Sequence, residues 1–342
     1  MADYLAGKVI AVTGAGRGIG RAVAIGCAAE GASVVVNDYG VSIDGREPGS
    51  AVAESVAQEI RDAGGHAVPC ADSVTTMAGG ARIVQTAVDA FGRLDGVVCV
   101  AGILRERMLF NMAEDEWDPV IETHLKGTFT VFRAASAVMR KAGGGALVGF
   151  TSGNHAGSVS QANYSAAKGG IVSLVRSAAL GLGRYGITAN AVAPVARTRM
   201  SANVPFDMAE MGEPEDVAPL VAYLLSDAAR AVTGQIYTVA GRRIAVWNQP
   251  RELRSMYGEE PWTAESIAKR LPEAVGVETM PMIAKMAAYA KATEDRKAAE
   301  EQGGAGQAGG EQGAAEEQAG AEQGRAAQDG AGQAATEQGG AR

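Results

Sequence analysis

Apolar positions over the first 240 residues form short β-branched runs that alternate with stretches of helical spacing. The runs expected to form buried strands are residues 8–13, 32–38, 66–70, 94–102, 145–150, 187–193 and 234–240, the last strand of the series. Helices are expected at residues 21–30, 50–63, 77–91, 114–141, 161–180 and 214–225. This alternation predicts an α/β fold, a doubly wound parallel sheet with helices on both faces.

The pattern changes after the predicted sheet. Residues 263–271 follow a threonine cap and read as a short helix, and residues 282–299 read as another. From residue 300 onward the chain contains no Val, Ile, Leu, Met or aromatic residue, so it cannot bury enough apolar surface to order itself. We expect a sheet domain over residues 1–245, a helical extension over 246–299 and a disordered tail over 300–342.

Polar and glycine residues gather where the predicted strands end. In a parallel sheet these carboxyl ends lie along one edge, and ligands bind in the crevice beyond it. The residues placed there are a glycine-rich turn, Asp38, Asp72, Gly102, Ser152 and Pro194. The sequence therefore predicts one crevice for a nucleotide and a substrate.

The glycine-rich turn runs from Thr13 to Gly20 as T-G-A-G-R-G-I-G, between a strand and a helix. Glycines let the backbone approach a pyrophosphate, and the helix N-terminus favours its negative charge. Asp38 lies 18 residues beyond Gly20, where an acid can bind the ribose hydroxyls of NAD and repel the 2′-phosphate of NADP. Arg17 would favour that phosphate, so the two signals conflict; we predict NAD from Asp38. The alternative for Asp38 is a solvent-facing acid at a strand end.

Tyr164 and Lys168 are four residues apart in a stretch with helical spacing, so both side chains lie on one face. A nearby ammonium favours the phenolate and is expected to lower the tyrosine pKa from its ordinary value near ~10. The pair can then exchange protons near neutral pH. The alternative interpretation is an exposed helix pair without chemistry.

Composition narrows the function classes. The chain has 342 residues, is 47 % hydrophobic and carries a net charge of −8, with no basic stripe, so we expect no nucleic-acid partner. No apolar stretch is long enough for a membrane span, and the N-terminus has no signal-peptide pattern. Cys27, Cys70 and Cys99 are scattered, without metal spacing, which indicates reduced core thiols in a cytoplasmic protein without a metal site.

These motifs together resemble the short-chain dehydrogenase/reductase family over about residues 5–245. The segments that carry the resemblance are Thr13–Gly20, Ala101-Gly102, Tyr164-x-x-x-Lys168 and Asn190-A-V-A-P194. Four further segments look most like the (3R)-hydroxyacyl-CoA dehydrogenase part of multifunctional protein type 2 and bacterial hydroxysteroid relatives: residues 34–40, 102–108, 124–129 and 161–168.

The resemblance implies a Rossmann-type fold and an NAD(P)-dependent enzyme acting on CH–OH groups. Tyr164 would exchange the substrate proton, Lys168 would hold the nicotinamide ribose, and a serine would orient the substrate oxygen. The cofactor-binding residues implied are Gly14, Arg17, Gly18, Ile19, Gly20, Asp38, Asp72, Ser73, Ala101, Gly102, Tyr164, Lys168 and Thr198. The family also implies a homodimer or homotetramer.

Three departures from the family pattern stand out. Cys99-Val100 replaces the two asparagines that often precede Ala-Gly, and His124 occupies the catalytic asparagine position. His124 either continues a proton relay or is a buried structural histidine. The family's serine spacing falls on Thr151, whereas the strand pattern places Ser152 at the strand exit; we choose Ser152, and Thr151 could supply the same hydroxyl.

The segment from Ala196 to Gly212 is expected to be a short substrate lid, with methionines and Phe206 suited to an apolar ligand and Arg197 and Arg199 to coenzyme A phosphates. The leading hypothesis is an NAD-dependent dehydrogenase for a 3-hydroxyacyl-CoA or a hydroxysteroid. The alternatives are an NADPH-dependent 3-oxoacyl-carrier-protein reductase, supported by Arg17, and a catalytically poor cofactor-binding scaffold.

Overall fold

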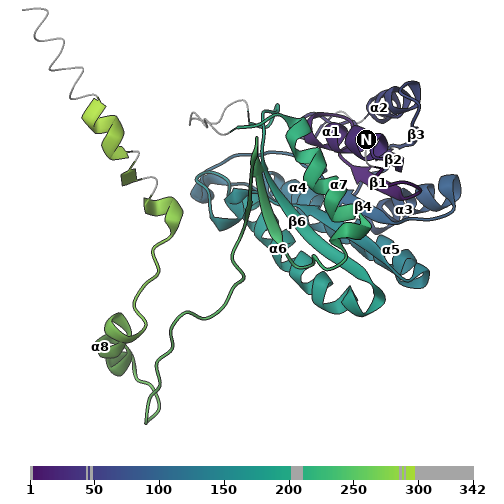
Figure 1. The fold of residues 1–342 in the computed structure, drawn as a ribbon. Helices are drawn as coiled ribbons and strands as arrows, with labels where there is room; N and C mark the ends of the chain where they lie inside the picture. Colours follow the sequence, from purple (N-terminus) through teal and green to yellow (C-terminus); the bar gives the residue numbers. More distant parts are fainter. Residues whose placement is uncertain are drawn as a thin grey trace, which may run out of the picture. The chain divides into compact units, whose positions relative to one another are not determined.

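The structure is a computed structural model that describes residues 3–43, 45–46, 49–201, 211–284, 287–288 and 290–296. Two compact units divide the chain, Met1–Glu252 and Leu253–Arg342. The first unit contains the sheet and its covering helices, and the second contains α8 (Ala264–Ala274) (Figure 1). None of the helices in the described ranges is long and apolar enough to cross a membrane.

Within the described residues, eight strands form one sheet in the order β3-β2-β1-β4-β5-β6-β7-β8. The strands are β1 (Val9–Thr13), β2 (Ser33–Asn37), β3 (His66–Cys70), β4 (Gly96–Cys99), β5 (Gly145–Phe150), β6 (Ile187–Val195), β7 (Ile236–Ala240) and β8 (Arg243–Val246). All neighbours are parallel except β7 and β8. The prediction of a doubly wound parallel sheet is confirmed. The prediction that residues 234–240 form the last strand is wrong, because Gly241, at φ 52°, turns the chain back into β8.

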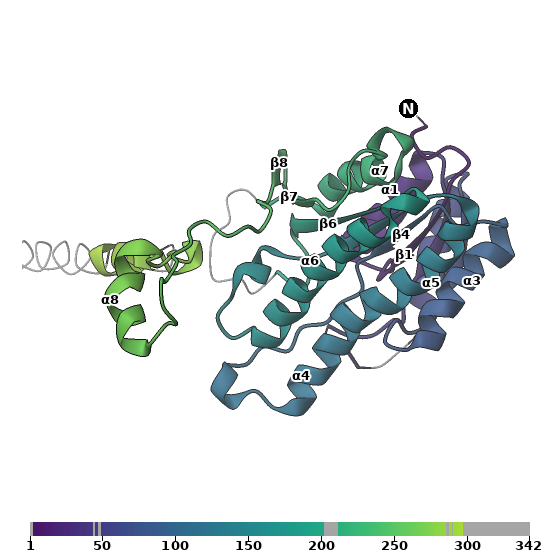
Figure 2. The same ribbon diagram turned by 90° about the horizontal axis from the view of Figure 1, so that it is seen from below.

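Helices cover both faces of the sheet, as Figure 2 shows. One face packs against α1 (Gly18–Ala29), α2 (Ala51–Asp62) and α7 (Ala218–Leu225). The other packs against α3 (Met77–Phe91), α5 (Gly127–Ala142) and α6 (Ala162–Leu182). Along β1 the buried side chains alternate between the two cores, which is why the strands read as continuous apolar runs.

Shorter helical elements lie between these. The predicted helix over 114–141 is α4 (Glu114–Ile121), a π-helical turn (Glu122–Lys126) and then α5. The predicted helix over 214–225 begins as a 3-10 turn (Pro214–Val217) before α7. Further 3-10 turns, which the sequence analysis did not predict, are Leu109–Asn111, Gly153–Ala156, Gly183–Tyr185 and Asp227–Ala229.

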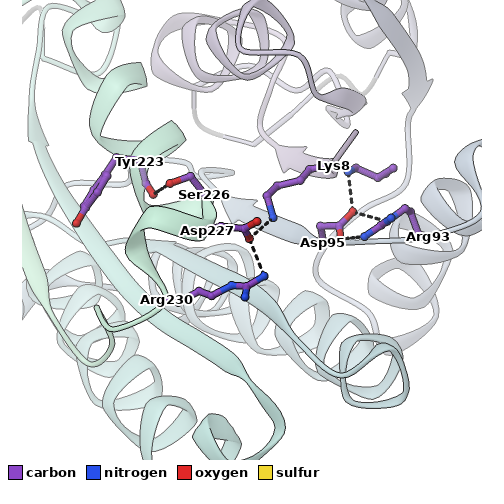
Figure 3. Close-up of polar contacts among 8 residues, drawn as sticks. Lys8, Arg93, Asp95, Tyr223, Ser226, Asp227 and Arg230 are labelled. Atoms are coloured by element: carbon purple, nitrogen blue, oxygen red, sulfur yellow. Dashed lines mark hydrogen bonds and ion pairs between the residues drawn. The ribbon is translucent and has the colours of Figure 1, made fainter. Parts of the chain in front are cut away.

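Ion pairs hold the amino-terminal ends of the strands (Figure 3). Lys8, just before β1, pairs with Asp227 at 2.7 Å, and Arg230 pairs with the same carboxylate at 3.1 Å. Asp95, just before β4, accepts the Val9 N–H at 2.9 Å and pairs with Arg93. These contacts fix the edge of the sheet opposite the glycine-rich turn.

The second unit contains α8, whose start agrees with the predicted threonine cap. Thr263 accepts the Ser266 N–H at 3.1 Å, and the Arg270 guanidinium lies 5.1 Å from the Trp262 ring centroid. Near the predicted helix over residues 282–299, the described backbone is helical at residues 281–284, 287–288 and 290–296. The predicted tail over 300–342 lies outside the described residues, and the predicted domain boundaries stay predictions.

Candidate functional site

The glycine-rich turn leads from β1 into α1 without space for larger side chains. A Cβ built on Gly14 would lie 2.7 Å from the Ala101 Cα, and one on Gly20 would lie 2.0 Å from the Gly14 carbonyl oxygen. Arg17, the N-cap of α1, makes no side-chain capping bond. The first N–H groups of α1 are therefore available to an anion, and the turn fits a dinucleotide pyrophosphate.

Asp38 follows β2 directly and lies beside this turn. Its Oδ2 accepts the Gly16 N–H at 2.8 Å, and its Oδ1 accepts the Gly40 N–H at 2.7 Å. A Cβ on Gly16 would lie 2.7 Å from Oδ2, so the glycine permits this approach. The carboxylate is fixed in position, and each oxygen retains a lone pair for a ribose hydroxyl.

Arg17 and the start of the predicted lid lie on the same side of the turn. The Arg17 side chain is exposed, and the Thr198 Cγ2 lies 3.6 Å from a Cβ built on Gly18. Burial lowers the pKa of Arg199, the charge of Arg17 lowers it further, and Asp38 opposes them. Ile19, by contrast, packs on the core. Residues 202–210 of the predicted lid, including Phe206, lie outside the described residues.

The other predicted cofactor residues follow β3 and β4. Asp72 pairs with Arg82 at 2.5 Å, and the Ser73 Oγ lies 3.0 Å from the Thr75 Oγ1. The Ala101 N–H donates to the Thr13 Oγ1 at 3.4 Å. These residues share the carboxyl edge of the sheet with the turn, as the topology requires.

Tyr164 and Lys168 lie in the first turns of α6. The Lys168 Nζ is 5.3 Å from the Tyr164 ring centroid and donates to the Phe150 carbonyl at 2.7 Å. Lys168 is only 4 % exposed, and this burial lowers its pKa to about 7, against a small opposing effect of Cys99. The interpretation as an exposed helix pair is therefore wrong.

Burial raises the pKa of Tyr164 to about 12, and a hydrogen bond with the Ser152 side chain lowers it only in part. The expected lowering of this pKa by Lys168 is wrong for this structure. Desolvation of the phenolate is the largest effect on Tyr164, and Lys168 does not lower this pKa because burial drives the lysine itself toward its neutral form.

The two candidate hydroxyls after β5 have different partners. The buried Thr151 Oγ1 donates to the Lys168 carbonyl at 2.9 Å. This hydrogen bond ties the end of β5 to helix α6. The Ser152 side chain lies beside Tyr164, where it lowers the pKa of that phenol, and its Oγ accepts the Asn154 N–H at 3.2 Å. The geometry favours Ser152 as the hydroxyl that acts together with Tyr164.

His124 lies in the π-helical turn, with 2 % exposure, and its ring is 5.1 Å from the Tyr164 ring at 89°. Its Nε2 lies 2.8 Å from the Ile103 carbonyl oxygen and 3.2 Å from the Ile103 backbone nitrogen, so both backbone polar groups of Ile103 hold the ring in place. Burial and the charge of Lys168 hold the His124 pKa well below its usual value. A Cβ on Gly102 would lie 2.3 Å from the His124 Cε1, so Gly102 makes room for this ring.

Comparison with known proteins gives the family. The family model described as Enoyl-(Acyl carrier protein) reductase matches residues 14–241. The hydroxyacyl-CoA dehydrogenase ChsB1 of Mycobacterium tuberculosis is 43 % identical over 263 residues, which cover 72 % of this chain and 81 % of that protein. The chain belongs to the short-chain dehydrogenase/reductase family.

Other proteins similar to this chain support the same family assignment. A crystal structure of a short chain dehydrogenase from Mycobacterium avium has a TM-score of 0.73 and 44 % identity, covering 81 % of this chain and 98 % of that one. The peroxisomal multifunctional enzyme type 2 of Mus musculus is 40 % identical over 265 residues, 76 % of this chain and 36 % of that protein. As a family member this chain is an NAD(P)-dependent dehydrogenase/reductase, and the resemblance predicted from the motifs is confirmed.

Two groups at this site, Asn163 and the Phe150 carbonyl, are not predicted from the sequence. The carbonyl belongs to the backbone, so no side chain marks it. Asn163 is fully buried, and its position directly before Tyr164 at the start of a helix was the available signal.

Proposed function

We propose that this protein is an NAD-dependent oxidoreductase that interconverts a secondary alcohol and a ketone, on a 3-hydroxyacyl-CoA or a hydroxysteroid. The observation that carries the proposal is the contact between the Tyr164 hydroxyl and Ser152, beside buried Lys168. This group lies at the same sheet edge as the glycine-rich turn and Asp38, so one crevice can take a cofactor and a substrate.

In this proposal the α1 N-terminus binds the pyrophosphate and Asp38 binds the adenosine ribose. The remaining cofactor contacts fall to Asp72, Ser73, Ala101, Gly102 and Thr198. A bound nicotinamide supplies hydride transfer, and the protein supplies orientation and proton movement. Tyr164 exchanges a proton with the substrate oxygen, Ser152 orients that oxygen, and Lys168 holds the nicotinamide ribose. His124 is neutral and its ring packs against the Tyr164 ring, so it is the next residue of the proposed proton relay.

The preference for NAD rests on Asp38, whose carboxylate is held beside the turn by the Gly16 and Gly40 N–H groups. A 2′-phosphate placed there would meet this negative charge. Exposed Arg17 favours the alternative, an NADPH-dependent 3-oxoacyl-carrier-protein reductase. The third alternative, a catalytically poor cofactor-binding subunit or scaffold, rests on Val100, His124, the displaced serine and the added tail.

The acyl-CoA class is supported by the names of relatives, since ChsB1 is called a hydroxyacyl-CoA dehydrogenase. Exposed apolar side chains after β4 also suit an acyl chain or a subunit contact; Leu109 is 70 % exposed and Phe110 is 78 % exposed. A homodimer or homotetramer is part of the proposal, and light scattering that shows a monomer would contradict it. The cytoplasmic location stays a prediction.

Oxidation of a (3R)-3-hydroxyacyl-CoA, with NAD and NADP side by side, tests the proposal. Reduction of NAD much faster than NADP, lost in Tyr164→Phe, is the expected result. Faster turnover with NADP(H) and a 3-oxoacyl carrier protein would favour the reductase. Cofactor binding without turnover of acyl-CoA, steroid or carrier-protein substrates would favour the scaffold.

A further inference from the structure

Asn163, the residue before Tyr164, uses its whole side-chain amide inside the protein. It is 0 % exposed. Its Nδ2 donates to the carbonyls of Arg105 and Glu116, both at 2.8 Å, and its Oδ1 accepts the Tyr164 N–H at 2.7 Å. One side chain thus joins the segment after β4, helix α4 and the start of α6.

The bond to Tyr164 has a specific place in α6. The first helical backbone bond of α6 runs from the Ser165 N–H to the Gln161 carbonyl at 2.8 Å. Tyr164 therefore supplies one of the N–H groups that a helix start leaves without an intrahelical partner. Gln161, the N-cap, makes no side-chain capping bond. Asn163 satisfies the backbone of Tyr164 and fixes the start of the helix that carries its ring.

The segment after β4 and the start of α6 also meet at other polar contacts. The Arg107 N–H donates to the Ser160 carbonyl at 2.8 Å, and the Gln161 side chain bonds with both Asn154 and Glu106. Ser160 has φ 59°, and it is the non-glycine residue with positive φ in the described part of the chain. Strain of this kind persists where surrounding contacts over-determine the backbone, often at active sites.

We infer that Asn163 is a positioning residue: it holds the segment after β4 and helix α4 against α6, and so sets where the Tyr164 hydroxyl lies relative to Ser152 and Lys168. This inference rests on the proposed proton transfer by Tyr164. A displacement of about 1 Å at a reacting group can lower a rate about a hundredfold, which is why a residue without substrate contact can govern kcat.

Asn163→Asp tests this, because it keeps the side-chain shape and the acceptor but removes both donors. Asn163→Ser is the second variant, which introduces no charge and whose hydroxyl can make at most one of the two donor contacts. The matched control is Asn190→Asp in β6, where Nδ2 also donates to a carbonyl, that of Val232, at 2.8 Å, and Oδ1 accepts the Gln235 N–H at 3.0 Å. Asn190 is 1 % exposed, so both Asn→Asp changes make a similar demand on folding.

The measurements are kcat and KM for NAD on the folded fraction, the Kd of NADH by fluorescence, and hydrogen exchange of residues 103–112. We expect kcat to fall roughly 10- to 100-fold in both Asn163 variants, with KM for NAD and the NADH Kd within about twofold. Exchange in 103–112 rises. Asn190→Asp changes neither kcat nor that exchange.

A wild-type kcat in either folded Asn163 variant would overturn the inference, as would a kcat loss equal to that of Asn190→Asp. A wild-type protein without turnover would contradict the proposed function instead. Hydrogen exchange still tests the coupling in that case, because it needs no substrate.

Discussion

The two ends of the sheet carry charge in opposite ways. At the amino-terminal ends, Lys8 pairs with Asp227 at 2.7 Å and Arg93 pairs with Asp95 at 2.6 Å, close to solvent. At the carboxyl ends, Lys168 is buried, and in the described residues it donates to a carbonyl and forms no ion pair. The first arrangement satisfies charges, whereas the second leaves a titratable group in an environment that resists charge.

The pKa directions record this difference. The hydrogen bond from Lys8 lowers the pKa of Asp227, which favours its charged form. Burial shifts the pKa values of Lys168 and Tyr164 toward their neutral forms, to about 7 and about 12. Groups displaced in this way by burial are typical of sites that move protons. Changes to Tyr164 and Ser152 at the carboxyl ends should therefore affect turnover, whereas changes to the ion pairs at the amino-terminal ends should affect only stability.

The largest effect is expected for Tyr164→Phe. Removal of the hydroxyl deletes the proposed proton donor and acceptor, so kcat should fall about 10²- to 10⁴-fold. Tyr237→Phe on β7 is the control, since that tyrosine is also partly buried and its pKa is also raised by burial. Steady-state kinetics on both variants checks this. Comparable kcat values for Tyr164→Phe and wild type would contradict the site.

Substitutions of the adjacent residues Ser152 and Thr151 are expected to have different effects, one on turnover and the other on stability. Ser152→Ala should lower kcat about 10²-fold, the usual effect of one missing donor to a reacting oxygen. Thr151→Val leaves the Lys168 carbonyl without its 2.9 Å donor, and should lower the free energy of unfolding by about 1–3 kcal/mol. Kinetics and urea unfolding of both variants measure this. The reverse pattern would assign the catalytic hydroxyl to Thr151.

Asp38→Asn tests the choice of cofactor. The variant keeps an acceptor but loses the charge, so the ratio of kcat/KM for NAD to that for NADP should fall about 10- to 100-fold. Asp227→Asn at the opposite sheet end removes a charge too, and should leave the ratio unchanged. A ratio that does not move in Asp38→Asn would assign selectivity to Arg17 and its neighbours.

The fold and the edge of the site could be predicted from the sequence because both follow from the local pattern of apolar and polar residues. Continuous apolar runs predict strands buried on both faces, and the strand ends then place Asp38, Ser152 and the turn at one edge. The strand β8 was missed because Arg243–Val246 is short and largely exposed, so it carries no buried run. Strand β8 is stabilised by its antiparallel pairing with β7, and this pairing leaves no pattern in the sequence.

Tertiary burial explains the remaining differences. The spacing of Tyr164 and Lys168 predicted contact correctly, but it could not show that both groups are desolvated, so the expected pKa direction of the tyrosine was wrong. Similarly, residue spacing did not decide whether Thr151 or Ser152 supplies the catalytic hydroxyl. The two are distinguished only by their contacts with α6 in the folded protein. Asn163 has backbone partners in two other segments, and backbone carbonyls leave no mark in a sequence.

Lys168→Met should change how stability depends on pH. The folded pKa of Lys168 is about 7 and the unfolded value is ~10.4, so between these values the unfolded chain binds more protons. The free energy of unfolding should therefore rise with pH above 7, by up to about 1.4 kcal/mol per pH unit from this group. Urea unfolding between pH 7 and 8.5 should show a smaller rise in Lys168→Met. Lys8→Met is the control and should keep the slope.

The smallest effect is expected at the amino-terminal ends, for Lys8→Met itself. Asp227 is 63 % exposed and also contacts Arg230, so loss of the pair should cost about 0.2–1 kcal/mol of unfolding free energy. Because Lys8 lowers the pKa of Asp227, this contribution is present above the ordinary aspartate pKa and is lost as pH falls through the lowered value. Urea unfolding at low and high salt measures it, and kcat should equal that of wild type. A fall in kcat comparable to that of Ser152→Ala would mean that the two ends of the sheet are coupled, and that the separation of stability from turnover does not hold.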